Sequence, residues 1–209
     1  MFTKCNSGVG VRLKTVAVLL AAFSSLSPAI ARADWQAVEQ VKTYAIAGKS
    51  GAELYASIGE RGPLVGGKTR TVAFTNFKLT WSRKYETVSG ACTLVSARPN
   101  LTITYTLPKP AERLPPDTAK NWDTFITGIR NHENVHGVMI KDMVKAIETA
   151  SVGMSVPGDR DCRKLKADLT KRLSELSLAQ RQRSREFDRA ELSEGANIHQ
   201  LILNLVNGS

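Results

Sequence analysis

Apolar and polar residues alternate along the first half of the chain, as they do in β-strands with one buried face. The clearest case is the segment Leu101–Leu107, where apolar side chains occupy every second position and threonines stand between them. Similar alternation predicts three further strands, over residues 38–47, 71–86 and 92–98. A Ser50/Glu53 capping box predicts a short helix over residues 50–59. We therefore expect an antiparallel, β-rich N-terminal part.

The second half of the chain has helical periodicity instead. From Asn121 onward, apolar residues recur every three or four positions as far as Ile147, which predicts a long helix with one buried stripe. Four leucines at the same spacing predict a second long helix from Asp159 to about Ala190, and a last amphipathic segment runs from Ile198 to Val206. Strands come first and helices after, so the predicted fold class is α+β in a single domain.

The first long helix contains the sequence His132-Glu133-Asn134-Val135-His136, an HExxH motif. Helical residues four apart lie on nearly the same face, about 6 Å apart along the axis, so both imidazoles can reach one ion. In zinc hydrolases the Glu of this motif takes a proton from metal-bound water, which predicts Glu133 as the general base. A solvated His/Glu face is the alternative. However, both histidines fall on the apolar stripe, where a buried ring without a partner is costly.

Residues 1–33 are predicted to be a signal peptide. They combine a basic start, an apolar run over residues 15–26 and the small residues of Ala31-Arg32-Ala33. The apolar run is too short to span a bilayer comfortably, although a retained membrane anchor is the alternative. Cleavage after Ala33 would export residues 34–209 to the periplasm or the medium as one domain with no transmembrane segment.

The net charge of the mature chain gives little information about function. The predicted signal peptide carries four basic residues and no acidic ones, so the mature chain has 25 Lys and Arg against 19 Asp and Glu, a net charge of +6. This modest excess argues against nucleic acid as a partner. Much of it lies between Arg160 and Glu191, where ten basic residues face six acidic ones. We interpret this helix face as solvated, with an interaction surface for anionic lipid or polymer as the alternative.

Two cysteines remain after signal removal, Cys92 and Cys162. An even number of cysteines in an oxidising compartment predicts a disulfide between them. Zinc binding by this pair is disfavoured, because the two residues lack the CxxC spacing of thiolate zinc sites.

Taken together, these features resemble the DUF922 family of bacterial secreted proteins, which are described as predicted zinc-dependent proteases of the zincin-like group. The resemblance rests on short motifs in a fixed order: Tyr44-Ala-Ile-Ala-Gly48, the segment from Ser50 to Gly62-Pro63, Leu79-Thr-Trp81, Cys92, Leu107-Pro108, Trp122-x-x-Phe125, the HExxH motif and Cys162. It implies a zincin-like metallopeptidase that binds one Zn²⁺ through His132 and His136 and acts on a peptide or protein substrate.

The third zinc ligand is where the chain departs from the family pattern. In that pattern an aromatic-Asp pair after the last long helix is followed by Thr-x-His-Gly, whose His is a plausible ligand. Phe187-Asp188 matches the pair, but Glu194-Gly195 stands where His-Gly is expected. The resemblance therefore implies Glu194 as the third ligand, because a carboxylate can complete a site with two His. Asp188, Glu191 and His199 remain open as alternatives.

A metzincin arrangement is excluded by helix geometry. Metzincins take their third ligand ten residues after the first His, which is Asp142 here, after a helix-ending Gly at the seventh position, which is Met139 here. With Met139 the helix continues and turns Asp142 away from the histidines. The third ligand should therefore come from the C-terminal region.

We expect an exported zinc metalloprotease in which the strand Leu101–Leu107 lies at the edge of the cleft and pairs with an extended substrate. An internal strand is the alternative for that segment. Two other functions stay open. One is a zinc-binding domain that no longer cleaves, which the missing third His motivates. The other is an envelope interaction module that uses the basic helix over 160–189.

Overall fold

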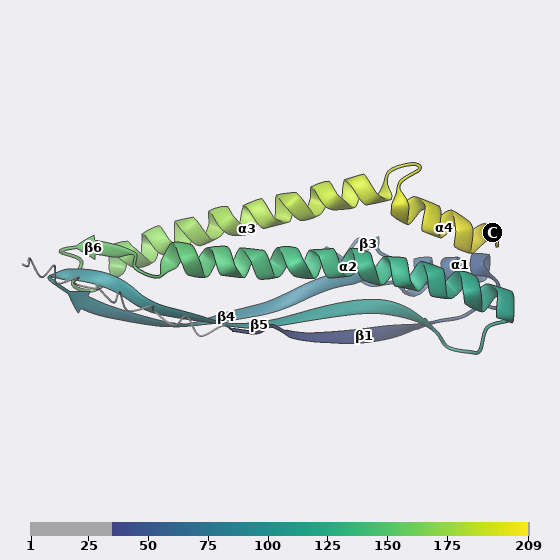
Figure 1. The fold of residues 1–209 in the computed structure, drawn as a ribbon, viewed down its shortest axis with the longest axis horizontal. Helices are drawn as coiled ribbons and strands as arrows, with labels where there is room; N and C mark the ends of the chain where they lie inside the picture. The colour runs from purple at the N-terminus through teal and green to yellow at the C-terminus, as the bar shows by residue number, and fades with distance from the viewer. Residues whose placement is uncertain (1–34, 209) are drawn as a thin grey trace, which may run out of the picture. The chain divides into compact units, whose positions relative to one another are not determined.

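A computed structural model describes residues 35–208, and the predicted signal peptide over residues 1–33 lies outside this part. The described residues form an α+β domain, with most strands before the long helices, as predicted (Figure 1). The elements are, in order, β1 (Val38–Ile46), α1 (Gly51–Arg61), β2 (Leu64–Val65), β3 (Thr69–Arg70), β4 (Phe74–Val88), β5 (Ala91–Pro110), α2 (Pro116–Ser151), β6 (Ser155–Pro157), α3 (Arg163–Leu192) and α4 (Asn197–Asn207).

The main sheet is mixed, and the expectation of a purely antiparallel part was wrong. Its strand order is β1-β5-β4, with the short β6 added to the start of β5. β4 and β5 are antiparallel because a two-residue turn at Ser89-Gly90, with positive φ at both residues, joins them directly. β1 pairs with β5 in parallel. The long connection through α1, the β2–β3 hairpin and β4 gives the chain the length that a parallel crossover needs.

β5 is one continuous strand, although the sequence predicts two strands separated by Pro99-Asn100. Pro99 lies opposite Trp81 of β4, and the pairing with β1 begins only at Thr102. At Pro99 the strand therefore has a single neighbour. A proline is tolerated there because its missing N–H interrupts no second ladder.

The same pairing corrects the expected role of Leu101–Leu107. This segment lies between β1 and β4 and hydrogen-bonds with both, so it is internal and has no free edge for a substrate strand. Its apolar side chains are buried under α2 instead. Leu101, Ile103 and Tyr105 belong to a cluster with Ile140 and Met143, and Leu107 belongs to a cluster with Phe125.

The helices begin close to the predicted positions. The capping box at α1 is present: Ser50 Oγ accepts from the Glu53 amide, and the Glu53 carboxylate accepts from the Ser50 amide. α3 begins at Arg163 rather than at Asp159. Asp159 lies before the helix, and its carboxylate accepts hydrogen bonds from the first-turn amides of Arg163 and Leu165. None of the helices between residues 35 and 208 combines the length and apolar character required to cross a membrane.

Three apolar clusters form the core, and two of them include residues of α2. The first joins α1, α4 and the start of α2 around Leu54, Phe125 and Ile129. The second places the middle of α2 on the sheet, and the third packs the start of α3 directly on β5, around Leu165. Along α2, the HExxH motif lies between Ile129 of the first cluster and Ile140 of the second. The polar motif therefore occupies the interval between two apolar cores.

The predicted disulfide is confirmed: Cys92 of β5 is bonded to Cys162 at the start of α3, with their Cα atoms 5.4 Å apart. The bond closes a loop of 70 residues that contains all of α2. Because long closed loops restrict the unfolded chain most, we expect the double variant Cys92→Ala/Cys162→Ala to lose about 4 kcal/mol of unfolding free energy. Urea denaturation of oxidised wild type and variant measures this loss, and equal midpoints would contradict the expectation.

Candidate metal centre

The two His and the Glu of the HExxH motif are buried or largely covered at the centre of α2, whereas Asn134 and Val135 are exposed. Residues at the spacing of helix turns form its buried stripe, and His132 and Glu133 belong to that stripe. The His136 side chain is also largely covered, with 12% of its surface exposed. The apolar residues that the sequence places on either side of the motif therefore carry the polar residues into the interior.

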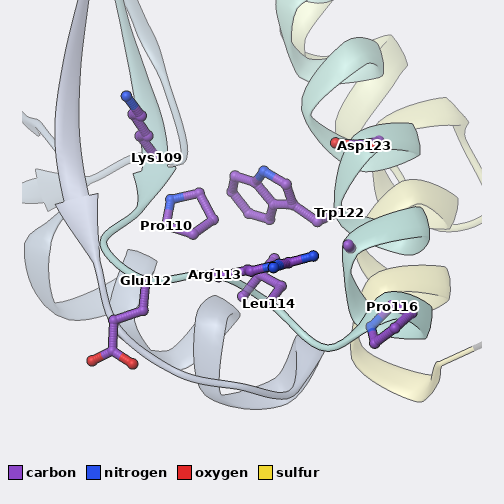
Figure 2. Close-up of a pocket in the computed structure, with 9 residues that line it drawn as sticks. Lys109, Pro110, Glu112, Arg113, Leu114, Pro116, Trp122 and Asp123 are labelled. Carbon is purple, nitrogen blue, oxygen red and sulfur yellow. The ribbon is translucent and has the colours of Figure 1, made fainter.

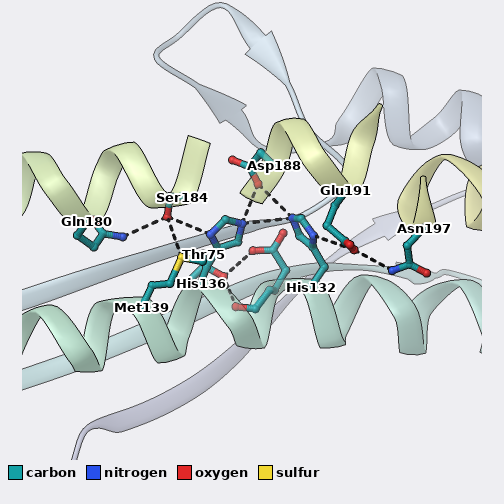
Figure 3. A network of polar contacts seen from close by, with 10 residues as sticks. Thr75, His132, His136, Met139, Gln180, Ser184, Asp188, Glu191 and Asn197 are labelled. Atoms are coloured by element: carbon teal, nitrogen blue, oxygen red, sulfur yellow. Dashed lines mark hydrogen bonds and ion pairs between the residues drawn. The ribbon is translucent and has the colours of Figure 1, made fainter. Parts of the chain in front are cut away.

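α3 contributes a polar stripe that faces these histidines. Its members recur every three or four residues, so they lie on one face of the helix. They are Gln180, Ser184, Asp188 and Glu191. Figure 3 shows Ser184, Asp188 and Glu191 pointing from α3 toward the imidazoles of α2. Two successive helices thus form one polar site.

Three potential metal ligands converge at the centre of this site. Asp188 Oδ1 lies 3.2 Å from His132 Nε2 and 2.8 Å from His136 Nε2. The two Nε2 atoms lie 3.2 Å from each other. Among residues 35–208, this is the one group of three His, Cys or acidic side chains whose donor atoms all lie within 4.8 Å of one another. The donors form a nearly equilateral triangle that could hold a metal ion.

The triangle is also an electrostatic unit. Burial works against ionisation of Asp188, but hydrogen bonds from His132 and His136 outweigh it and hold the pKa of the carboxyl well below its ordinary value. For His136, burial opposes protonation, yet Asp188 prevails and raises the pKa of the imidazole. The site therefore favours an ionised Asp188 carboxylate.

Glu133 points to the sheet side of α2 rather than toward α3. Its carboxylate Oε2 accepts a hydrogen bond of 2.5 Å from Thr75 Oγ1, at the start of β4. Burial raises the pKa of Glu133, while the Thr75 hydrogen bond and the two histidines act in the opposite direction. A carboxyl group with a raised pKa is suited to accept a proton and later return it.

The Nδ1 atoms of the two imidazoles, which face away from the triangle, have different surroundings. His136 Nδ1 lies 3.1 Å from Ser184 Oγ, which itself accepts a hydrogen bond from the Gln180 amide. His132 Nδ1 is buried and, within residues 35–208, has no hydrogen-bond partner. Phe187 covers both rings: it stacks on His132, with centroids 4.7 Å apart, and meets His136 edge-on.

The donor set fits a zinc ion. Two imidazole nitrogens and one carboxylate oxygen are among the ligand sets of catalytic zinc sites, and the fourth position stays open there. In a tetrahedral site with metal–ligand bonds of about 2.0–2.1 Å, donor atoms lie about 3.3 Å apart. The distances of 2.8 to 3.2 Å between the donors are a few tenths of an ångström shorter. A small separation of α2 and α3 would admit the ion.

The residue after the motif fixes the distance between α2 and the sheet. A Cβ at Gly137 would lie 2.0 Å from the Tyr105 hydroxyl oxygen of β5, so only glycine permits this approach. The Tyr105 hydroxyl donates to Glu39 of β1, at 2.6 Å, and Lys141 of α2 donates to the same carboxylate. Tyr105 is thus engaged in holding α2 on the sheet.

The candidates for the third ligand are placed clearly. Glu194, which the resemblance implies, is exposed in the turn between α3 and α4 and lies outside the triangle. His199 Nδ1 accepts a hydrogen bond from the Gly195 amide in the same turn. Glu191 lies beside His132, on its Nδ1 side. Asp188, which the sequence retained only as an alternative, supplies the third donor. Asp142 is exposed on α2, as helix geometry predicts.

Several site residues escaped sequence reasoning. Thr75 lies in a strand whose alternation gives no sign of contact with α2. Ser184 lies in a helix rich in charge, where the leucine stripe is the dominant pattern, and the sequence marks Phe187 only as part of the Phe187-Asp188 pair, with no role at the site. One signal was available: Gln180, Ser184, Asp188 and Glu191 continue that stripe with polar residues, beyond the point where the leucines stop. A polar continuation of a buried stripe indicates a polar partner on the facing helix.

The two cavities described in the structure lie away from the triangle, where β5 ends and α2 begins. The larger one, of about 580 Å³, is lined by Lys109, Arg113 and Trp122 among others. Figure 2 shows Trp122 between Pro110, at the end of β5, and the first turns of α2. The smaller one, of about 210 Å³, shares Trp122 and extends along α2 to Arg130. Neither is lined by a residue of the HExxH motif.

Comparison with known proteins yields one family. Residues 41–195 match the family described as bacterial protein of unknown function (DUF922). No curated protein matches the chain, and no solved structure does. The matched region runs from β1 through the turn after α3, so it contains the HExxH motif, both cysteines and Asp188. The chain belongs to the DUF922 family.

Proposed function

We propose that the protein is an exported, zincin-like metalloprotease that hydrolyses peptide bonds with one bound zinc ion. The observation that carries the proposal is the triangle of His132, His136 and Asp188. Glu133 follows His132 directly in α2 and is buried. Two His ligands, a carboxylate ligand and an adjacent buried Glu are the groups that metal-assisted hydrolysis requires. The disulfide supports export, because such bonds persist in oxidising compartments.

In this proposal His132, His136 and Asp188 hold the metal. When bound, zinc supplies a Lewis acid that polarises the substrate carbonyl and lowers the pKa of a coordinated water to about 7. Glu133 accepts the proton of the attacking water and returns it to the leaving amine. Thr75 Oγ1 donates to Glu133 Oε2, and the carboxylate keeps further lone pairs that can receive the proton. Thr75 therefore orients the general base from the sheet.

A metal-binding domain that does not cleave is the second candidate. Glu133 has only 6% of its surface exposed, and Phe187 covers both imidazole rings. A structural metal site with a closed surface would have these properties, because it needs no access for a substrate.

The test uses oxidised mature chain, residues 34–209. We expect about one zinc per chain by elemental mass spectrometry. We also expect hydrolysis of an unfolded protein substrate that a chelator abolishes and added zinc restores. Zinc without hydrolysis over a broad set of peptides would favour the second candidate. No bound zinc in correctly oxidised protein would contradict both.

A further inference from the structure

His132 carries an unsatisfied polar atom at the proposed metal centre. Its Nδ1 is buried and has no hydrogen-bond partner among residues 35–208, while its Nε2 faces Asp188 and His136. A buried N–H without an acceptor costs free energy, so a partner is to be expected. If Nε2 binds a metal, the proton of the neutral ring must reside on Nδ1, and that atom becomes a donor.

Glu191 is the acidic side chain beside this atom. Its Oε2 lies 4.0 Å from His132 Nδ1, one helix turn along α3 from Asp188. The two ring nitrogens lie on different sides of an imidazole, so a carboxylate on the Nδ1 side cannot share the metal held at Nε2. A movement of about 1 Å would bring the oxygen within hydrogen-bond distance.

The position of the Glu191 carboxylate is fixed from a third helix. Asn197 Nδ2, at the first residue of α4, donates to Glu191 Oε2 over 2.8 Å. The Glu191 side chain is only 26% exposed. Figure 3 shows Glu191 between Asn197 and His132, with Asp188 on the other side of the ring. The carboxylate is thus directed at the imidazole rather than at solvent.

We propose that Glu191 is a positioning residue of the metal centre: it accepts the Nδ1–H of His132, selects the tautomer that ligates through Nε2, and is itself held by Asn197. The inference rests on the proposed metal function. Its counterpart at His136 is already formed, since Ser184 contacts Nδ1 there and Gln180 donates to Ser184. One face of α3 then supplies the carboxylate ligand and an outer partner for each histidine.

The test measures zinc affinity by competition with a chromophoric chelator. Loss of an outer partner of a ligating His lowers metal affinity about 10–100-fold, and this is the expected effect of Glu191→Ala. Glu191→Gln retains an uncharged acceptor and should weaken binding less than Glu191→Ala. Asn197→Ala keeps the Glu191 carboxylate but removes the hydrogen bond that holds it, so this variant should also lower the affinity. Glu186→Ala is the matched control, because Glu186 is exposed on α3 and contacts Gln182 of the same helix.

A second readout separates positioning from a general loss of structure. Nitrogen-15 NMR of the zinc-loaded protein should show His132 protonated at Nδ1, and Glu191→Ala should shift or broaden that signal while the His136 signal persists. Apo-protein melting temperatures should be similar for Glu191→Ala and Glu186→Ala. If wild type binds zinc and Glu191→Ala binds it equally well, the role of Glu191 is overturned and the metal centre stands. If wild type binds none, the metal centre itself fails.

Discussion

Replacing Glu133 with Gln is expected to keep about one zinc per chain while lowering peptide hydrolysis by about 10²–10⁴-fold. Gln has nearly the same shape and can still accept the Thr75 hydrogen bond, so the packing between α2 and β4 should survive. It cannot accept a proton from water, which removes the general base. Zinc content and initial hydrolysis rates, measured on the same preparations, check this expectation.

The control for this variant is Glu186→Gln, the same chemical change on the exposed face of α3. It should leave both zinc content and hydrolysis unchanged. Hydrolysis that persists in Glu133→Gln at the wild-type rate would remove Glu133 from the proposed mechanism. A joint loss of zinc and activity would show instead that Glu133 supports the metal site structurally.

Replacing Asp188 with Ala is expected to lower zinc affinity by more than the roughly 10–100-fold that loss of an outer partner causes, because the variant loses a charged ligand as well as a hydrogen-bond acceptor for both imidazoles. The side chain is 42% exposed and lies on the surface of α3, so the domain itself should remain folded. Chelator competition gives the affinity, and circular dichroism confirms the helix content.

Glu194→Ala is the informative comparison for Asp188→Ala, since Glu194 is the third ligand that the sequence resemblance implied. With Glu194 exposed in the turn after α3, this variant should bind zinc as wild type does. The reverse result, loss of zinc in Glu194→Ala and retention in Asp188→Ala, would show that the turn folds back over the histidines when metal is bound. That outcome would restore the assignment implied by the resemblance.

The sequence predicts local features of this fold well because short-range chemistry determines them. The capping box of α1, the stripe of α2 and the alternation of β5 depend on residues within a few positions of one another. The pairing of β1 with β5 depends on a crossover of more than fifty residues, and alternation carries no information about strand direction. The prediction of a strand break at Pro99 was wrong for a related reason. Whether a proline interrupts a sheet depends on how many neighbouring strands there are at that position.

The candidate site likewise has a part that local sequence predicts and a part that depends on tertiary packing. His132, Glu133 and His136 share one helix turn, so their spacing alone specifies a face and a chemistry. The third donor, Asp188, lies 52 residues after His136 on the next helix, and the register of that helix against α2 is determined by tertiary packing. The resemblance to the family pattern implies Glu194, whereas the position of α3 brings Asp188 within 2.8 Å of His136. Helix packing sets that choice, and a single sequence does not encode it in any local pattern.

The close approach of Gly137 to Tyr105 has a consequence for how the two helices respond to a cation. α2 is held against β5 there, so the histidines have little freedom to move. α3 is covalently attached at its first turn through Cys162, whereas in its second half Gln180 is the single buried residue of those described. Adjustment of the donor spacing therefore falls on the far half of α3. A bound ion would act as a second crosslink, at the opposite end of the helix from the disulfide. Binding of the ion and ordering of that half of α3 would then be thermodynamically coupled.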